Sequence, residues 1–142
     1  MAAAPSEYTV HGRSARGGSG TLTARTVSIP FDASWGADEP SGLPGPAELL
    51  AGAFSACMLK NLERAGSMLA FSYESAEVDV VARRQDTPPR FVEVTYELRV
   101  TTSETQHRVD LVHRNLQKFG TVYNTIAAAC DVHGTAVAVA PS

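Results

Sequence analysis

Residues 45–58 read GPAELLAGAFSACM, and this stretch of the chain decides the fold. Pro46 suits the first position of a helix, and Glu48 falls in the first turn, where the helix dipole favours an acid. Gly66 suits the position just past a helix end. Apolar residues cover almost the whole helix surface: Leu49, Leu50, Ala53, Phe54, Ala56, Cys57 and Met58. A helix of this kind is buried on most sides, so we expect it at the centre of the molecule.

Upstream of this helix the sequence predicts one strand and a long loop. The β-branched residues of Thr21–Ile29 favour a strand, and residues 1–20 have the composition of a frayed end with a glycine turn. Residues 32–46 hold three glycines and three prolines, a density that no helix or strand tolerates. A connection of this length suggests a functional loop or lid, and it contains Trp35, the only tryptophan of the chain.

Downstream of the helix, two segments alternate between apolar and polar residues. They are residues 76–83 and residues 92–100, joined by the turn sequence QDTPPR at 85–90. A period of two with one charged face predicts antiparallel strands with one side in water.

Two further helices and a last strand complete the expected order. Ser103 and Gln106 match the spacing of a capping box that opens a helix to about Lys118. Residues 121–130 suggest a short helix with Thr121 as its cap, and residues 135–139 suggest a strand. The order of strands, helix, strands, helices and strand predicts an α+β fold rather than alternating βαβ units.

The composition predicts an ordinary globular protein, with one domain over residues 1–142. The apolar fraction is 44%, and 12 basic against 15 acidic residues give a net charge of −3, which argues against nucleic-acid binding. No apolar run reaches the length of a membrane span, and the start MAAAPSEY does not resemble a secretory signal. Two cysteines do not make a disulfide scaffold, so we expect a cytoplasmic protein with no membrane partner.

Three segments together resemble the OsmC/Ohr family, the osmotically inducible and organic hydroperoxide resistance proteins. GPAELLAGAFSACM at 45–58 is similar to the family's central-helix motif, which carries a reactive cysteine. ARGGSGTLT at 15–23 resembles its N-terminal glycine-strand segment, and KFGTVYNTI at 118–126 resembles its second motif. The resemblance covers roughly residues 8–139. It implies an α+β fold with antiparallel sheets wrapped around a long central helix, in an intertwined homodimer.

The resemblance also implies a chemistry, the thiol-dependent reduction of organic hydroperoxides without a cofactor. Cys57 falls on the peroxide-reactive position, but Gly120 occupies the position of the second cysteine. Resolution would then need an external dithiol, such as a lipoylated protein. The acid of the peroxidases corresponds to Ala47, whereas Glu48 matches a branch with Pro-x-Glu-Leu. No arginine stands between residues 30 and 46, in the half of the chain where the family uses one.

Each candidate residue also has a purely structural interpretation. Cys57 is a reactive thiol or a small buried hydrophobe. Glu48 orients a cation or favours the helix N-terminus, and its nine-residue spacing from Cys57 turns the two to different sides of one helix. Cys130 lies ten residues beyond Gly120, so we expect packing rather than a disulfide with Cys57.

Four large side chains stand near the two motifs and allow two interpretations. They line an apolar pocket for an alkyl hydroperoxide, together with Gly120, or they belong to the dimer core: Trp35, Phe54, Met58 and Tyr123. No metal site is expected, because Cys130-x-x-His133 supplies two ligands and no second pair is nearby in sequence.

Two functions from different classes follow. The first is a peroxidase in which Cys57 attacks the hydroperoxide and an external thiol resolves the sulfenic acid. The second is a catalytically silent dimer that binds a small apolar ligand or senses redox state. Turnover of a hydroperoxide distinguishes them, so whether the chain is an enzyme stays open at this point.

Overall fold

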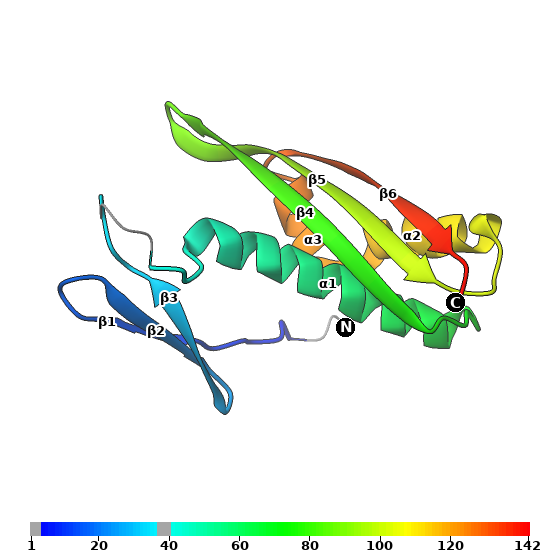
Figure 1. The fold of residues 1–142 in the computed structure, drawn as a ribbon, viewed down its shortest axis with the longest axis horizontal. Helices are drawn as coiled ribbons and strands as arrows, with labels where there is room; N and C mark the ends of the chain where they lie inside the picture. Colours follow the sequence, from blue (N-terminus) through cyan, green and yellow to red (C-terminus); the bar gives the residue numbers. More distant parts are fainter. Residues whose placement is uncertain (1–3, 37–40) are drawn as a thin grey trace. The chain divides into compact units, whose positions relative to one another are not determined.

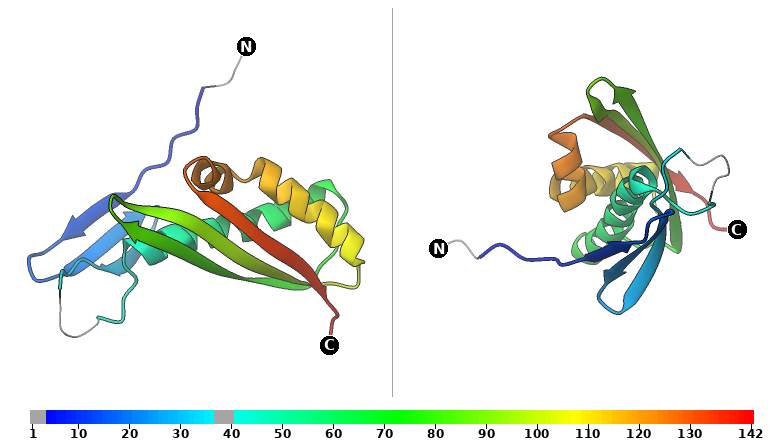
Figure 2. Two further views of the ribbon diagram at one scale, coloured as in Figure 1. Left: turned by 90° about the horizontal axis from the view of Figure 1, so that it is seen from above. Right: turned by 90° about the vertical axis from the view of Figure 1, so that its left-hand side faces the viewer.

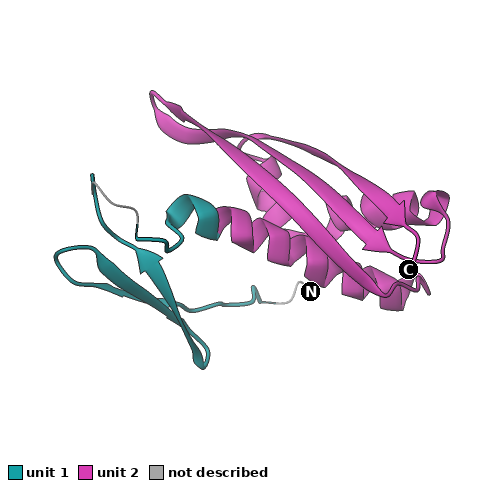
Figure 3. Ribbon diagram, viewed as in Figure 1, with its two compact units in different colours: residues 1–49 teal, residues 50–142 magenta. Residues whose placement is uncertain are grey.

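The computed structural model describes residues 4–36 and 41–142, which fall into two compact units, 1–49 and 50–142 (Figure 3). Each unit is described by itself. None of the described helices is long and apolar enough to cross a membrane.

Unit 1 holds a three-stranded antiparallel sheet (Figure 1). Its strands are β1 (His11–Ser14), β2 (Ser19–Ala24) and β3 (Val27–Asp32). The prediction of one strand over Thr21–Ile29 is therefore wrong, because the chain reverses at Arg25, which adopts a φ of 55°. The prediction of a frayed end is also wrong for β1, which pairs with β2 from His11 to Ser14.

Helix α1 (Pro46–Met68) begins at the predicted residue and continues two residues beyond Gly66. Its buried face carries Phe54, Met58, Leu62 and Ala65. The small residues Gly52, Ala53 and Ala56 are exposed. Within unit 2, one face of α1 is buried, and burial of the helix on its other sides, which the sequence leads us to expect in a homodimer, stays a prediction.

Unit 2 is built on a mixed sheet with strand order β4-β5-β6. β4 (Ser75–Asp86) and β5 (Pro89–Thr101) are antiparallel, as the alternating pattern predicts. β6 (Asp131–Val139) runs parallel to β5, so this sheet is not purely antiparallel. The reason is the connection: α2 (Gln106–Phe119) and α3 (Thr121–Ala127) carry the chain back before β6 begins.

The last strand starts at Asp131, four residues before the predicted start. Gly134 does not interrupt it but lies inside the strand, opposite Tyr96 of β5. A β carbon at position 134 would collide with Tyr96, so glycine allows the two strands to approach there.

The core of unit 2 lies between this sheet and the helices. In Figures 1 and 2, α1 and α2 lie on the same face of the sheet. Most buried side chains come from α1, the inner face of β5, α2 and α3; the largest that are fully buried are Phe54, Met58, Leu62, Leu98 and Leu116. Val109, Val112 and Leu116 form the predicted buried stripe of α2, while Phe119 at its end is 45% exposed.

The helix caps differ from the predicted ones. Thr105, not Ser103, caps α2: its hydroxyl accepts a hydrogen bond from the Arg108 amide at 3.2 Å. Gln106 does not reach back to Ser103 but bonds β6, donating to the Ala136 carbonyl and accepting from the Ala138 amide. Thr121 is the first residue of α3, and Gly120 precedes it as a cap without a side chain.

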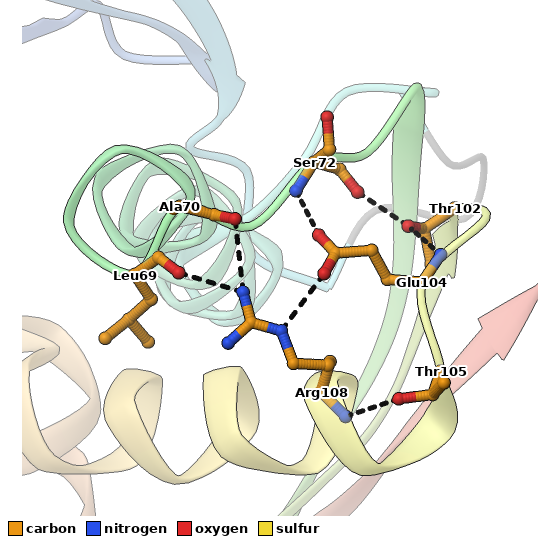
Figure 4. Close-up of polar contacts among 7 residues, drawn as sticks. All are labelled: Leu69, Ala70, Ser72, Thr102, Glu104, Thr105 and Arg108. Carbon is orange, nitrogen blue, oxygen red and sulfur yellow. Dashed lines mark hydrogen bonds and ion pairs between the residues drawn. The ribbon is translucent and has the colours of Figure 1, made fainter.

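A polar cluster ties the C-terminal end of α1 to the start of α2 (Figure 4). The Arg108 guanidinium donates to the Leu69 carbonyl at 2.9 Å and to the Ala70 carbonyl at 3.1 Å. The Glu104 carboxylate accepts from the Ser72 amide and from Arg108 Nε. These two bonds, with the Ser72 amide contributing most, lower the pKa of Glu104. Arg108 therefore holds the turn that follows α1 against the start of α2.

Candidate functional site

Cys57 lies on α1, one turn after the buried Phe54, and its side chain is partly buried. Its neighbour from the other helices is Gly120, which joins α2 to α3. A β carbon built on Gly120 would lie 3.2 Å from Cys57 Sγ. The two positions that the sequence resemblance pairs are therefore in direct contact in this fold.

Gly120 is held in place by backbone hydrogen bonds on both sides. Its amide donates to the Leu116 carbonyl at 3.0 Å, and its carbonyl accepts from the Asn124 amide at 2.8 Å. Its φ of −72° and ψ of 115° suit any L-residue, so glycine is not required by the backbone. The space is tight, because an added β carbon would also lie 3.0 Å from the Leu116 carbonyl oxygen and from Tyr123 Cβ.

A polar contact to the sulfur comes from Asn61, one turn further along α1. Asn61 Nδ2 lies 3.5 Å from Cys57 Sγ and 2.9 Å from the Cys57 carbonyl oxygen. Among residues 4–36 and 41–142, Asn61 is the one side chain that donates a hydrogen bond to this sulfur. The sequence signal for this contact is the spacing of four residues on a helix, which places the two side chains on one face.

The cation on the same side of α1 is engaged elsewhere. Arg64 follows Cys57 by seven residues, which is roughly 10 Å along the axis at about 1.5 Å per residue. Its Nη1 donates to Asn115 Oδ1 at 3.3 Å, and its guanidinium lies 4.7 Å from the centre of the Phe119 ring.

Aromatic side chains form a packed layer around Phe54. The ring of Phe54 lies 5.6 Å from that of Tyr96 and 5.5 Å from that of Tyr123, measured between ring centres. The Tyr96 hydroxyl lies 2.6 Å from His113 Nε2 and accepts from Gln117 at 3.3 Å. Burial raises the pKa of Tyr96 and lowers the pKa of His113, so both groups are favoured in their neutral forms.

The residues considered for an apolar pocket occupy two different environments. Phe54 and Met58 are 0% and 2% exposed and Tyr123 is 9% exposed, so they are core side chains of unit 2 itself. Trp35 belongs to unit 1 and is fully exposed. Its loop is closed by the Asp32 amide, which donates to the Pro44 carbonyl at 2.9 Å. The centre of the expected lid, residues 37–40, lies outside the described residues.

Unit 2 has two surface grooves that are lined by neither Cys57 nor Gly120. A groove of about 420 Å³ lies beside Gly66 and Tyr73, after the end of α1. A second groove, of about 290 Å³, runs along α2 from Arg108 to Phe119.

Glu48 has a structural contact at the start of α1. Its Oε1 accepts a hydrogen bond from the Gly45 amide at 3.1 Å, the geometry of an acid that caps its own helix start. This contact agrees with the structural interpretation of Glu48.

Cys130 follows α3 and precedes β6, and both cysteines are free thiols. Cys130 Sγ donates to the Ile126 carbonyl at 3.5 Å, and burial raises the pKa of its thiol. A thiol with a raised pKa holds less of the reactive thiolate at neutral pH than an ordinary cysteine does.

One cluster of potential metal ligands was not anticipated. His133 lies between two carboxylates, with Nε2 at 3.6 Å from Glu93 and Nδ1 at 3.4 Å from Asp131. The parallel register places Glu93 of β5 opposite Asp131 of β6, a non-local pairing that sequence spacing does not reveal. Cys130 does not belong to this group. Arg83 already pairs with Glu93 at 2.7 Å, so an ion-pair network explains the cluster.

Comparison with known proteins gives a consistent result. A family model described as OsmC-like protein matches residues 38–133. No curated protein sequence matches the chain. The OsmC-like protein of Mycoplasma pneumoniae has a similar structure, with a TM-score of 0.85 and 14% identity over 94% of this chain and 98% of that one.

Two similar structures carry names that refer to hydroperoxides. The organic hydroperoxide resistance protein OsmC from Legionella pneumophila has a TM-score of 0.75 and 18% identity, over 95% of this chain and all of that one. The organic hydroperoxide resistance protein OhrB of Bacillus subtilis has a TM-score of 0.68 and 17% identity, over 92% and 98% of the two chains. At such identities the likeness is one of fold.

Proposed function

This chain belongs to the OsmC-like protein family, and from that premise we propose that it reduces organic hydroperoxides through the thiol of Cys57. The observation that carries the proposal is the contact between Cys57 Sγ and position 120, at 3.2 Å from an added β carbon. That contact supports the assignment of Cys57 as the peroxide-reactive residue. Cys130, held against Ile126, is not part of the proposed cycle.

The proposed reaction has three balanced steps. The Cys57 thiolate attacks the terminal peroxide oxygen, the O–O bond breaks, and the alkoxide leaves and is protonated to the alcohol. The resulting sulfenic acid condenses with an external thiol to give a mixed disulfide and water. A second thiol then attacks the mixed disulfide, releasing the Cys57 thiol and an external disulfide. Because position 120 carries no sulfur, both thiols come from outside, and we propose a dithiol such as a lipoylated protein.

The aromatic side chains have a supporting role in this proposal. Phe54 and Tyr123, with Met58, are core side chains, and the partly buried Cys57 packs against this core. The alkyl group of the hydroperoxide would then rest on the edge of this apolar layer. We also propose Glu48 as the residue that orients a cation, from its match to the Pro-x-Glu-Leu branch of the family, and Trp35 as a pocket side chain, from its size and its place near the central-helix motif.

We also propose that the two units form one OsmC-like domain that assembles as a homodimer in the cytoplasm. The support is the exposed face of α1 within unit 2, which carries the small residues Gly52, Ala53 and Ala56. A helix that is apolar on this side gains stability when a second copy covers it. Light scattering during size-exclusion chromatography should give twice the mass of one chain. The variant Ala56→Glu should reduce that mass to one chain, whereas Ala127→Glu on α3 should leave the dimer intact.

The activity test uses cumene hydroperoxide with either dithiothreitol or reduced lipoamide as the thiol. Wild type and Cys130→Ser should consume the hydroperoxide, and Cys57→Ser should be inactive. Consumption by Cys57→Ser would move the reaction to another group, and inactivity of the folded wild type with both thiols would reject the peroxidase.

A second candidate function is redox sensing by a catalytically silent dimer. It is favoured by one observation, that the hydrogen-bond donor to the Cys57 sulfur in the described part of the chain is a neutral amide. A sensor would form a sulfenic acid or mixed disulfide at Cys57 once, without sustained turnover. Mass spectrometry after one equivalent of hydroperoxide, read beside the turnover assay, separates the two functions.

A further inference from the structure

We infer that Asn61 is a positioning residue for Cys57, holding the sulfur with its side-chain amide and stabilising its ionised form. A role of Asn61 in catalysis rests on the proposed function. Its effect on the Cys57 thiol is measured without a hydroperoxide, so a failure of this inference can be told apart from a failure of the proposed peroxidase activity.

The geometry fixes which end of the Asn61 side chain faces the sulfur. The atom 2.9 Å from the Cys57 carbonyl oxygen must be a donor, because a carbonyl only accepts. That atom is Nδ2, and the same nitrogen lies 3.5 Å from Cys57 Sγ. An amide nitrogen carries two hydrogens, so one serves the carbonyl and the other is directed to the sulfur.

The contact favours the thiolate over the thiol. A thiol sulfur is a weak acceptor, whereas an ionised acceptor forms a stronger, charge-assisted hydrogen bond. A hydrogen bond that is stronger to the charged form stabilises that form. The anchoring bond to the Cys57 carbonyl keeps the donor in place, so little order has to be gained when the thiol ionises.

The groups around the sulfur leave this role to Asn61. Tyr123 lies beside position 120, with its Cβ 3.0 Å from an added β carbon there, and it packs against Tyr96, whose hydroxyl lies next to His113. Burial keeps Tyr96 and His113 in their neutral forms near neutral pH. On α1 itself, Lys60 is exposed and Arg64 is bonded to Asn115. In the part of the chain that the structure describes, neither of these cations donates to the sulfur.

The test is the pH dependence of Cys57 alkylation by iodoacetamide, in a Cys130→Ser background that leaves one thiol. Asn61→Leu removes the donor, and its midpoint should move about one pH unit upward, a roughly tenfold loss of thiolate at neutral pH. Asn61→Asp places a carboxylate beside the sulfur and should move the midpoint further in the same direction. Asn61→Gln keeps the amide and should recover part of the wild-type profile.

A matched control is Asn115→Leu, which removes a neighbouring amide that bonds Arg64 rather than the sulfur. Its midpoint should equal that of the parent. An unchanged midpoint in Asn61→Leu, folded by circular dichroism, would overturn the inference. If Asn61→Leu does not fold, Asn61→Ala, which removes the same donor without adding a charge, decides the question. A shifted midpoint without hydroperoxide turnover would keep the role of Asn61 and reject the peroxidase.

Discussion

Cys57 Sγ and the β carbon that position 120 would carry lie 3.2 Å apart, although Gly120 is separated from Cys57 by two strands and a helix. An S–S bond is about 2.05 Å long, so a sulfur one bond beyond that β carbon can reach Cys57 by rotation about its own χ1. We therefore expect Gly120→Cys to form a disulfide with Cys57 after one equivalent of hydroperoxide. Mass spectrometry of the non-reduced peptides checks it.

In its reduced form, Gly120→Cys should be less stable to unfolding than the wild type. The new β carbon meets the Leu116 carbonyl oxygen and Tyr123 Cβ at 3.0 Å, closer than ordinary packing allows. Overpacking of this kind costs about 1–3 kcal/mol in the free energy of unfolding. Urea unfolding of Gly120→Ala and reduced Gly120→Cys should give similar losses. A disulfide between Cys57 and Cys130 in the wild type would contradict the assignment of position 120.

Truncation of Phe54 tests whether the large residues near the two motifs line a pocket or belong to the core. Its ring is fully buried and lies against Tyr96 and Tyr123. Phe54→Ala should therefore lower the free energy of unfolding by about 3–5 kcal/mol, the range for truncating a buried aromatic residue. Phe119→Ala, at a 45% exposed ring, is the matched control and should cost much less. Equal stability of Phe54→Ala and wild type would show that the ring lines an open pocket instead.

His113 should make stability sensitive to mild acid. Burial lowers its pKa, so the unfolded chain binds the proton more tightly than the folded one. Its contribution is complete above the unfolded value of about 6.5 and declines as the pH falls below it. His113→Gln should flatten this decline in urea unfolding curves between neutral pH and pH 5. The exposed His107→Gln is the control, and an identical slope in His113→Gln and wild type would refute the assignment.

Glu104 should act at lower pH, through the cluster that ties α1 to α2. Its pKa is lowered in the folded state by the Ser72 amide and Arg108, so the folded chain binds its proton less tightly. The stabilisation is complete above the unfolded value of about 4.3 and is lost as the pH falls through the folded value. Glu104→Gln should remove this acid-dependent loss, measured by urea unfolding below pH 5. The exposed Glu74→Gln should retain the wild-type slope.

Features set by local spacing could be predicted from the sequence. Pro46 begins α1, and the alternation on either side of residues 85–90 gives β4 and β5. The pairing of Cys57 with Gly120 is predicted by the family resemblance and not by spacing. The contact of Asn61 with Cys57 is predictable from spacing, because a residue four positions after Cys57 lies on the same face of the helix.

Other features depend on contacts that no local pattern encodes. The reversal at Arg25 uses a positive φ in a residue that rarely adopts one, so Thr21–Ile29 has the pattern of one strand. In the sequence, Gly134 suggests that the last strand starts after it. In the structure it lies inside β6, where the absence of a side chain allows β6 to approach Tyr96 of β5. The cluster of Glu93, Asp131 and His133 exists only after β6 has paired with β5.

The parallel pairing of β6 has a consequence for the order of events during folding. α2, Gly120 and α3 all lie in the connection between β5 and β6. A parallel pair of this kind closes late, because its loop must be ordered before the strands can exchange hydrogen bonds. We therefore expect the contact between Cys57 and position 120 to form as this connection becomes ordered, before β6 completes the sheet.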